Sequence, residues 1–504
     1  MKEKIADGAD AQGWPGLGDM PADEFRAALH SFADWIADYR EGIEKLKISP
    51  TLAPGEIASR LPEAPPEEAA PLEDIFRDFQ EIILPGLVHW GHPAFLGYFG
   101  STTTAPGILG EMLAAALNVS AMTWRTSPAA TELEGVVLDW LRQMLALPAE
   151  FTGVVYDTAS VAVMHALAAA RENLDPDARA LGLCGRAEVA PLRVYASDQA
   201  HSSVEKAAIT LGLGERNVLR VASDAAYRMD ISALASAIEE DLSEGITPMA
   251  VVATIGTTSS TSVDPLEAIA ALCQEHKLWL HVDAAYGGAM ALLPEGRHLM
   301  QGIEAADSIV VNPHKWLFVP LDFSALYLKR PELLRATFSL VPEYLRGDAE
   351  QAERNYMDYG IQLGRRFRAL KAWMVIRSFG RLGLAARIRE HIRLARLFAS
   401  WLEDDTLFEL LAPVIMGVVC FRAVSNVNAG ALMSKEESNE LNRRIVEAVN
   451  RTGEAYLTHT TLHGQVAIRL AVGNVLTEER HLMRVYEMVS REAARLLSLP
   501  RGAA

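Results

Sequence analysis

Four short apolar runs most constrain what this chain of 504 residues can fold into. The runs lie at residues 193–196, 249–255, 278–282 and 308–311, and stretches with a helical spacing of apolar residues separate them. They do not alternate between polar and apolar positions, which is typical of strands buried on both faces of a sheet. Helices between such strands indicate a parallel sheet that is covered on both sides. The sequence therefore predicts an α/β fold with a mostly parallel sheet over residues 101–380.

Other patterns flank this region on both sides. Residues 1–100 contain two predicted helices, at about 21–43 and 72–83, joined by the proline- and glutamate-rich stretch LPEAPPEEAAP. We interpret this part as an N-terminal helical segment. Residues 381–504 combine long helical patterns with strand-like segments, which predicts a small α+β C-terminal domain. The predicted elements of that domain are helices at 384–402 and 435–450, and strands near 414–421 and 465–470.

Charge and cysteine content narrow the class of partner. The formal net charge is −18 and the pI is about 5.2, which disfavours nucleic acids and anionic membranes because both bind positive surfaces. The three cysteines are too scattered for a disulfide framework or a metal site. The N-terminus has no apolar core of a signal peptide, and no uncharged run is long enough to cross a bilayer. We therefore expect a cytoplasmic protein that acts on a small molecule.

Polar side chains follow each of the predicted strands. Ligands of open α/β sheets bind beyond the carboxyl ends of the strands, so these residues are expected to share one site. The chain contains no GxGxxG, GxxxxGKS or HExxH sequence, which leaves nucleotide and zinc sites without support. The residues at the strand ends are Asp198, His201, Thr257, Thr258, Asp283, Asn312, His314 and Lys315.

Asp283 and Lys315 are the most informative pair among these residues. An amine that forms a Schiff base, together with a carboxylate that keeps a pyridinium nitrogen protonated, is what pyridoxal phosphate requires. Taken alone, such a pair is more often a buried ion pair, and only the surrounding residues favour the cofactor. His201 follows a strand end and can stack on the pyridine ring, although a structural histidine is the commoner case. Ser160 stands at the start of a predicted helix, where it can bind a phosphate or simply cap the helix.

Five ordered motifs resemble one known family. They are TSPAATELE, SDQAHSSVEKA, HVDAAYGG, NPHKW and YGIQLGRRFRALKAW, which span residues 126–373. Together they resemble the group II pyridoxal-phosphate decarboxylases, in particular the aromatic-L-amino-acid decarboxylase subfamily, from about residue 20 to 400 and more faintly beyond. The resemblance implies the aspartate-aminotransferase type of fold (fold type I). It also implies a homodimer with its active sites at the subunit interface.

The resemblance assigns roles to individual residues. Lys315 would form the Schiff base, Asp283 would hold the pyridinium and His201 would stack on the ring. Tyr344, on a charged loop at about 338–356, would return a proton to the α-carbon of the substrate. The remaining cofactor-binding residues would be Ala159, Ser160, Thr258, Ala285, Asn312 and His314, and the substrate pocket would include Trp90, Phe99, Ser101 and Met122.

These assignments imply decarboxylation of phenylalanine, tyrosine, tryptophan or dopa to the amine. Related aldehyde synthases carry phenylalanine at the position of Tyr344, so that tyrosine favours plain decarboxylation over oxidative deamination. A decarboxylase of glutamate or of a sulfinate would need a cation that binds the distal acid group of its substrate. The aromatic side chains of Trp90 and Phe99 disfavour this alternative. A catalytically silent relative would not be expected to keep Lys315 and Asp283.

Some positions depart from the family pattern or have another explanation. Thr158 and Ala159 replace a glycine pair, and Ser120 and Met122 replace larger residues, which predicts a pocket of different shape. The arginines of the GRRFR stretch are expected to form internal ion pairs and to have no catalytic role.

Overall fold

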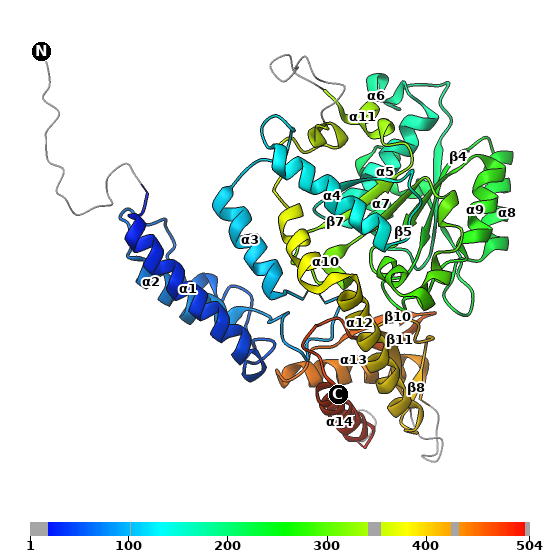
Figure 1. Cartoon of the computed structure of the whole chain (residues 1–504). Helices are drawn as coiled ribbons and strands as arrows, with labels where there is room; N and C mark the ends of the chain where they lie inside the picture. Colours follow the sequence, from blue (N-terminus) through cyan, green and yellow to red (C-terminus); the bar gives the residue numbers. More distant parts are fainter. Residues whose placement is uncertain (1–18, 101, 341–353, 425–432, 499–504) are drawn as a thin grey trace, which may run out of the picture.

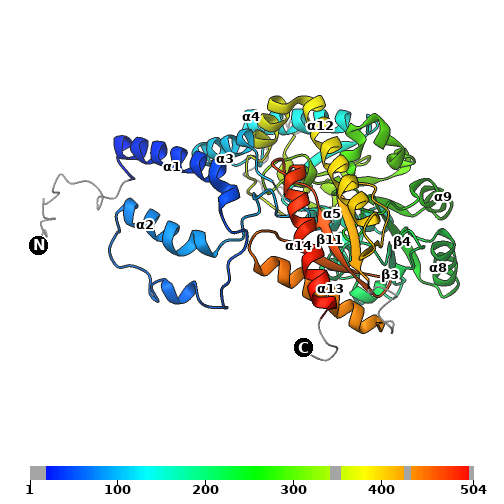
Figure 2. The same ribbon diagram turned by 90° about the horizontal axis from the view of Figure 1, so that it is seen from below.

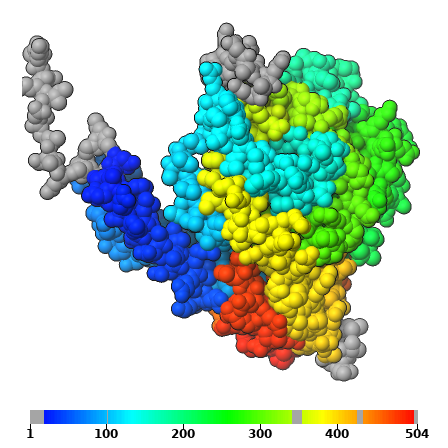
Figure 3. All heavy atoms as spheres, viewed as in Figure 1, coloured from blue at the N-terminus to red at the C-terminus, as the bar shows by residue number. Residues whose placement is uncertain are grey.

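The computed structural model describes residues 19–100, 102–340, 354–424 and 433–498. The N-terminal part forms an arm of two helices that stands away from the rest of the chain (Figures 1 and 3). Its helices are α1 (Ala22–Gly42) and α2 (Leu72–Asp78), and a π-helical turn, Phe79–Ile83, extends the second. Both predicted helices are confirmed. None of the residues of α1 is buried within the single chain.

A seven-stranded sheet in the order β1-β7-β6-β5-β4-β2-β3 forms the centre of the molecule. The four predicted runs are its strands β2, β4, β5 and β6, which pair in parallel, so the mostly parallel sheet is confirmed. Strand β7 is the antiparallel member and pairs with both β1 and β6. The strands are β1 (Thr152–Tyr156), β2 (Leu192–Ser197), β3 (Val218–Val221), β4 (Thr247–Thr254), β5 (Trp279–Asp283), β6 (Ser308–Val311) and β7 (Ser324–Leu328).

Helices cover this sheet because its central strands are apolar on both faces. Helix α5 packs on β4, β5, β6 and β7, while α8 and α9 pack on β4 (Figure 1). The helices of this region are α3 (Ala105–Leu117), α4 (Pro128–Met144), α5 (Ala159–Leu174), α6 (Ala178–Leu181), α7 (Ser203–Thr210), α8 (Ile231–Ser243), α9 (Leu266–His276), α10 (Pro313–Trp316) and α11 (Glu332–Phe338). No helix in the described ranges is long and apolar enough to cross a membrane.

The C-terminal part has its own antiparallel sheet, in the order β10-β11-β9-β8, packed against α13, and α14 packs on α13 (Figure 2). Helix α12 leads into it and is kinked at Gly380, whose φ of +62° suits glycine. Predicted strand 414–421 starts only at Val418, where pairing with Ala471 begins. The elements are α12 (Ala369–Glu403), β8 (Phe408–Leu410), β9 (Val418–Ala423), α13 (Lys435–Arg451), β10 (Thr458–Leu462), β11 (Gln465–Ala471) and α14 (Glu479–Leu497). The domain limits near residues 100 and 380 stay a prediction.

The three arginines of the GRRFR stretch form internal ion pairs, as expected. Arg366 pairs with Glu111 and Arg368 with Asp322, whereas the pair of Arg365 and Glu134 is the buried one, with 4% and 1% of the side chains exposed. The two guanidinium nitrogens of Arg365 donate to the two carboxylate oxygens of Glu134 at 3.0 and 2.6 Å. This bidentate pair connects α4 to the segment that precedes α12.

Replacing Arg365 with methionine is expected to lower the free energy of unfolding by about 3–5 kcal/mol, because the Glu134 carboxylate then stays buried without a cation. Chemical denaturation measures this loss. The matched control is Arg393→Met, which breaks an ion pair to Glu390 whose side chains are 51% and 48% exposed, and it is expected to cost less than about 1 kcal/mol. Similar small losses in both variants would contradict the structural role of Arg365.

Candidate active site

The carboxyl ends of the central parallel strands open into one cavity of about 200 Å³. This volume exceeds the roughly 30 Å³ occupied by one liquid water several-fold, so the cavity accommodates part of a small organic molecule. All nine residues predicted to bind the cofactor line it. The cavity is lined by Phe99, Thr158, Ala159, Ser160, His201, Thr254, Gly256, Thr258, Asp283, Ala285, Tyr286, Asn312, His314 and Lys315.

Lys315 lies in the short helix α10, directly after the buried strand β6. Its backbone amide donates to the carbonyl of Asn312 at 2.9 Å, which turns the chain at the strand end. Burial lowers the pKa of the Lys315 ammonium, nearby Arg469 lowers it further, and Asp283 opposes the shift. A lysine with a lowered pKa is more often present as the free amine, which is the form that attacks an aldehyde.

Asp283 ends strand β5, the neighbour of β6, and is 7% exposed. One carboxylate oxygen accepts a hydrogen bond from the backbone amide of Ala285 at 3.0 Å. Thr254 lies beside Asp283 in the register of β4 and β5, and its buried hydroxyl has no hydrogen-bond partner among the described residues. An unsatisfied hydroxyl beside a buried carboxylate on the cavity wall suits a polar ligand that donates and accepts hydrogen bonds. Asp283 thus fits the pyridinium nitrogen of pyridoxal phosphate.

Two histidines occupy different positions at the cavity. His201 follows β2, and its Nδ1 accepts from the amide of Ser203 at 3.1 Å. Its ring remains accessible from solvent in the single chain, which suits a residue that stacks on a bound ring. Partial burial lowers the pKa of His201 while Asp283 raises it. His314 is buried; burial, reinforced by Lys315, lowers its pKa to about 4.

His314 is therefore neutral at pH 7, and its tautomer follows from its partner. Nδ1 accepts a hydrogen bond from the amide of Phe323 at 3.0 Å, so Nε2 carries the proton. The neighbouring Asn312 accepts a hydrogen bond from the hydroxyl of Ser324, which fixes the orientation of its amide. Both side chains are thus held by the protein before any ligand binds.

The start of α5 supplies the third side of the cavity. Ala159 and Ser160 are its first two residues, and Thr158 caps it by accepting from the amide of Val161 at 3.5 Å. Amides in the first turn of a helix have no partner within the helix and favour an anion. The Ser160 hydroxyl and these amides fit the phosphate group of the cofactor.

Of the four residues predicted to bind the substrate, only Phe99 is found at the cavity among those that the structure describes. Phe99 lines the cavity, and its ring centroid lies 5.1 Å from the Lys315 ammonium nitrogen. Trp90 and Met122 do not line it in the single chain; Trp90 stacks on Tyr98 instead, with ring centroids 5.5 Å apart. Ser101 and Tyr344 lie outside the described residues, so their roles stay predictions.

Three side chains at the site were not predicted from the sequence. Thr254 is a strand residue, and only its register beside Asp283 identifies it. Tyr286 belongs to the HVDAAYGG motif, and its ring stacks on Phe99 with centroids 3.9 Å apart. Arg469 comes from β11 of the C-terminal part, and its guanidinium lies 4.8 Å from the same Phe99 ring. No signal near Arg469 in the sequence connects it with the other residues.

Known proteins share this architecture along nearly the whole chain. The model of the pyridoxal-dependent decarboxylase conserved domain matches residues 54–424. Tryptophan decarboxylase 2 of Oryza sativa subsp. japonica is 39% identical and is matched over 98% of this chain and 99% of its own. A phenylacetaldehyde synthase from a Rosa hybrid cultivar is also 39% identical, over 95% and 96% of the two chains. The crystal structure of Oryza sativa TDC with PLP and tryptamine superposes with a TM-score of 0.91 at 36% identity, over 96% of this chain and 100% of that chain.

The chain belongs to the pyridoxal-dependent decarboxylase family. It is accordingly a carboxy-lyase that uses pyridoxal 5′-phosphate, with the fold type I architecture expected from the resemblance. The side chains around the cavity fit this cofactor on three sides: an amine, a carboxylate and a helix start.

Proposed function

We propose that this enzyme decarboxylates aromatic L-amino acids of the phenylalanine, tyrosine, tryptophan and dopa class to the corresponding amines. One observation carries the proposal: the cavity wall beside Lys315 is aromatic, made by Phe99 with Tyr286 stacked behind it. An aromatic substrate ring gains both apolar burial and ring stacking against such a wall. The similarity to a tryptophan decarboxylase supports the same class of substrate.

In the proposed reaction, the side chains of the protein bind the cofactor and orient the substrate. Bound pyridoxal phosphate supplies an electron sink for negative charge at the substrate α-carbon. Asp283 holds a proton at the ring nitrogen, His201 packs on the ring face, and the start of α5 holds the phosphate. Phe99 and Tyr286 place the substrate side chain so that the carboxyl group occupies the position from which carbon dioxide leaves. Tyr344 is our candidate for the acid that returns a proton to the α-carbon.

A decarboxylase of acidic amino acids is the second candidate, because Arg469 places a buried cation at the site. Its guanidinium donates to the carbonyls of Thr258, Ser259 and Tyr98, but Nη2 has no partner within the part of the chain that the structure describes. The aromatic proposal takes precedence because the Phe99 ring covers this guanidinium. A panel of aromatic amino acids, glutamate and cysteine sulfinate, with amines identified by mass spectrometry, separates the two. Faster turnover of either acid than of every aromatic substrate would overturn the aromatic proposal.

Tyr344→Phe is expected to shift the product from amine to aldehyde, because the variant lacks the hydroxyl that would protonate the α-carbon. Amine, aldehyde and hydrogen peroxide formed from one aromatic substrate are measured together in the parent and the variant. The control is Tyr359→Phe, which should leave the product ratio unchanged. Tyr359 lies in the same region of the chain, within the described residues. Amine as the sole product of Tyr344→Phe would show that another group supplies the proton.

We infer that a second copy of the chain covers the arm and the neighbouring face of the body. The apolar residues between α1 and α2 are only partly buried, and α3, on the side of the body that faces the arm, exposes leucines (Figures 1 and 3). Leu109, Leu113 and Leu117 are 53%, 49% and 59% exposed. An apolar surface of this kind marks an interface between protein chains. The apolar groove of the arm is lined by Phe32, Trp35, Ile36, Leu72, Ile75, Phe76 and Phe79.

Replacing Leu113 and Leu117 together by glutamate is expected to convert a homodimer into a monomer, because two charges would be buried at the interface. Sedimentation velocity distinguishes the monomer from the dimer. The control is Leu242→Glu on α8, which is 47% exposed on the opposite side of the body and should remain dimeric (Figure 1). A monomeric parent, or a dimeric double variant, would contradict the interface.

A cytoplasmic location is part of the proposal. Cys184, Cys273 and Cys420 are all free thiols, and two of them are buried. Unpaired cysteines suit a reducing compartment.

A further inference from the structure

Three stacked aromatic rings connect the cavity with the interior of the protein. The Phe99 ring, at the cavity, stacks on Tyr286 with centroids 3.9 Å apart and an interplanar angle of 19°. Tyr286 in turn stacks on Trp316 at 4.5 Å and 8°. Trp316 directly follows Lys315 in α10 and is 1% exposed. Trp316, the chain neighbour of Lys315, and Phe99, on the cavity wall, therefore belong to one stack of rings.

The inner end of the stack is held by His391 of helix α12. The indole Nε1 of Trp316 donates to Nδ1 of His391 at 3.0 Å, and Nε2 of His391 lies 3.1 Å from the backbone oxygen of Asn474. An indole nitrogen can only donate, so Nδ1 carries no proton and Nε2 donates to Asn474. Burial lowers the pKa of His391 to about 4, which keeps the ring neutral at pH 7.

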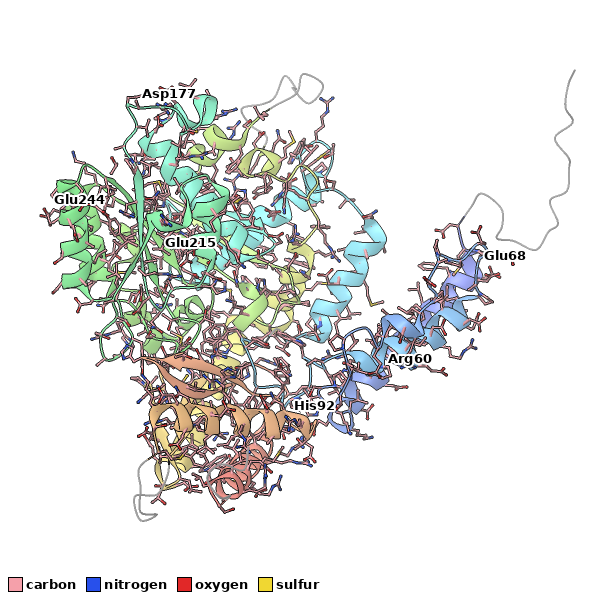
Figure 4. All side chains as sticks on the ribbon, turned by 180° about the vertical axis from the view of Figure 1, so that it is seen from behind. Arg60, Glu68, His92, Asp177, Glu215 and Glu244 are labelled. Carbon is pink, nitrogen blue, oxygen red and sulfur yellow. The ribbon has the colours of Figure 1, made fainter. Side chains whose placement is uncertain are left out.

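Asn474 connects His391 to the segment of the chain that leads to Phe99. Its side-chain amide donates to the backbone oxygens of Gly91 and His92 at 2.8 and 3.1 Å. His92 lies where the arm joins the body, and Arg60 lies farther out along the arm (Figure 4). His391 thus stands between Trp316, next to the reactive lysine, and the segment that leads to Phe99.

We propose that His391 is a positioning residue for the reaction: by holding the indole of Trp316 it fixes the ring stack, and with it the relative placement of Lys315 and Phe99. The proposal rests on the proposed function, because it assigns the aromatic wall to the substrate ring. His391 touches neither the cavity nor the reacting atoms, since it is absent from the cavity lining and only 3% exposed.

Loss of the hydrogen bond between Trp316 and His391 is expected to lower kcat. Without an acceptor, the buried indole N–H loses the hydrogen bond that it makes in the described structure, and the ring is free to tilt. A tilt of Trp316 is passed to Tyr286 and Phe99 because the three rings are in van der Waals contact. Misplacement of a substrate by about 1 Å can lower the rate about 10²-fold, so kcat for aromatic substrates is expected to fall between about 10-fold and 100-fold.

Two near-isosteric variants separate positioning from general stability. His391→Asn keeps an acceptor oxygen where Nδ1 stands and loses the bond to Asn474. His391→Gln keeps a donor nitrogen where Nε2 stands and loses the acceptor for Trp316. A merely structural histidine predicts similar losses in both variants. The positioning role predicts that His391→Asn keeps kcat within about 3-fold of the parent while His391→Gln shows the full loss.

Trp316→Phe tests the other end of the bond, since it keeps a ring but removes the N–H. Its effect on kcat and that of His391→Gln should not multiply in the double variant, because both remove the same interaction. Near-ultraviolet circular dichroism of the protein without cofactor reports the ring stack directly. His391→Asn should keep the parent spectrum, and His391→Gln should change it.

The decisive experiment combines kcat with the spectrum of cofactor-free protein for the parent, His391→Asn, His391→Gln and Trp316→Phe. The expected result is a parent-like His391→Asn and matching losses in the other two. Equal behaviour of the asparagine and glutamine variants, in either direction, would overturn the positioning role. If the parent converts no aromatic amino acid, the proposed function fails, while the circular dichroism still decides whether His391 fixes the stack.

Discussion

Replacing Lys315 with alanine is expected to lower kcat by a factor on the order of 10⁴, because no other lysine lines the cavity in the described part of the chain. The variant removes the amine to which we assign the bond with the cofactor aldehyde and leaves Asp283, His201 and the start of α5 in place. Cofactor binding through these groups should persist, so the loss should appear in kcat at saturating pyridoxal phosphate.

Peptide mapping checks the same assignment without turnover. Reduction of the parent with borohydride should attach a phosphopyridoxyl mass to the peptide that contains Lys315, and the Lys315→Ala variant should carry none. Lys435→Ala, at an exposed position in α13, is the control and should keep both activity and labelling. Parent-like activity of Lys315→Ala, or a label on another peptide, would refute the assignment.

Replacing Asp283 with asparagine is expected to lower kcat about 10²- to 10³-fold even at saturating cofactor. A neutral amide has nearly the shape of the carboxylate but does not hold a proton at the pyridine nitrogen, so negative charge at the α-carbon loses its stabilisation. The buried position of Asp283 strengthens this effect, because charge interactions are stronger away from water.

A conservative variant distinguishes charge from shape at this position. Asp283→Glu keeps the charge but lengthens the side chain, whereas Asp283→Asn keeps the shape but loses the charge. Steady-state kinetics should rank the glutamate variant above the asparagine variant if charge is the decisive property. The reverse order, or full activity of Asp283→Asn, would contradict the role of the carboxylate.

The sequence was sufficient for the parts of the site that lie at strand ends. Asp283 and Lys315 each follow an apolar run, and the ends of neighbouring parallel strands must meet, so their proximity followed from local patterns alone. The strand β7 was not predicted. Its antiparallel direction could not be predicted either, because a run of apolar residues does not indicate the direction in which a strand pairs. The start of α12 at Ala369 was missed because the predicted helix began only beyond the kink at Gly380.

Contacts between distant segments could not be predicted. Arg469 reaches Phe99 from the C-terminal sheet, and His391 reaches Trp316 from α12, 75 residues farther along the chain. Such contacts depend on how helices and sheets pack, which no local periodicity encodes. The same reason explains why the unsatisfied hydroxyl of Thr254 became evident only from the register of β4 against β5.

The stoichiometry of the reaction shows whether the enzyme decarboxylates aromatic L-amino acids to amines. The protein loaded with pyridoxal phosphate is incubated with phenylalanine, tyrosine, tryptophan and dopa labelled in the carboxyl carbon, and labelled carbon dioxide and amine are measured together. We expect one carbon dioxide and one amine for each molecule consumed of at least one of these substrates. Release of carbon dioxide with aldehyde and ammonia in place of the amine, or no release from any aromatic substrate, would contradict this expectation.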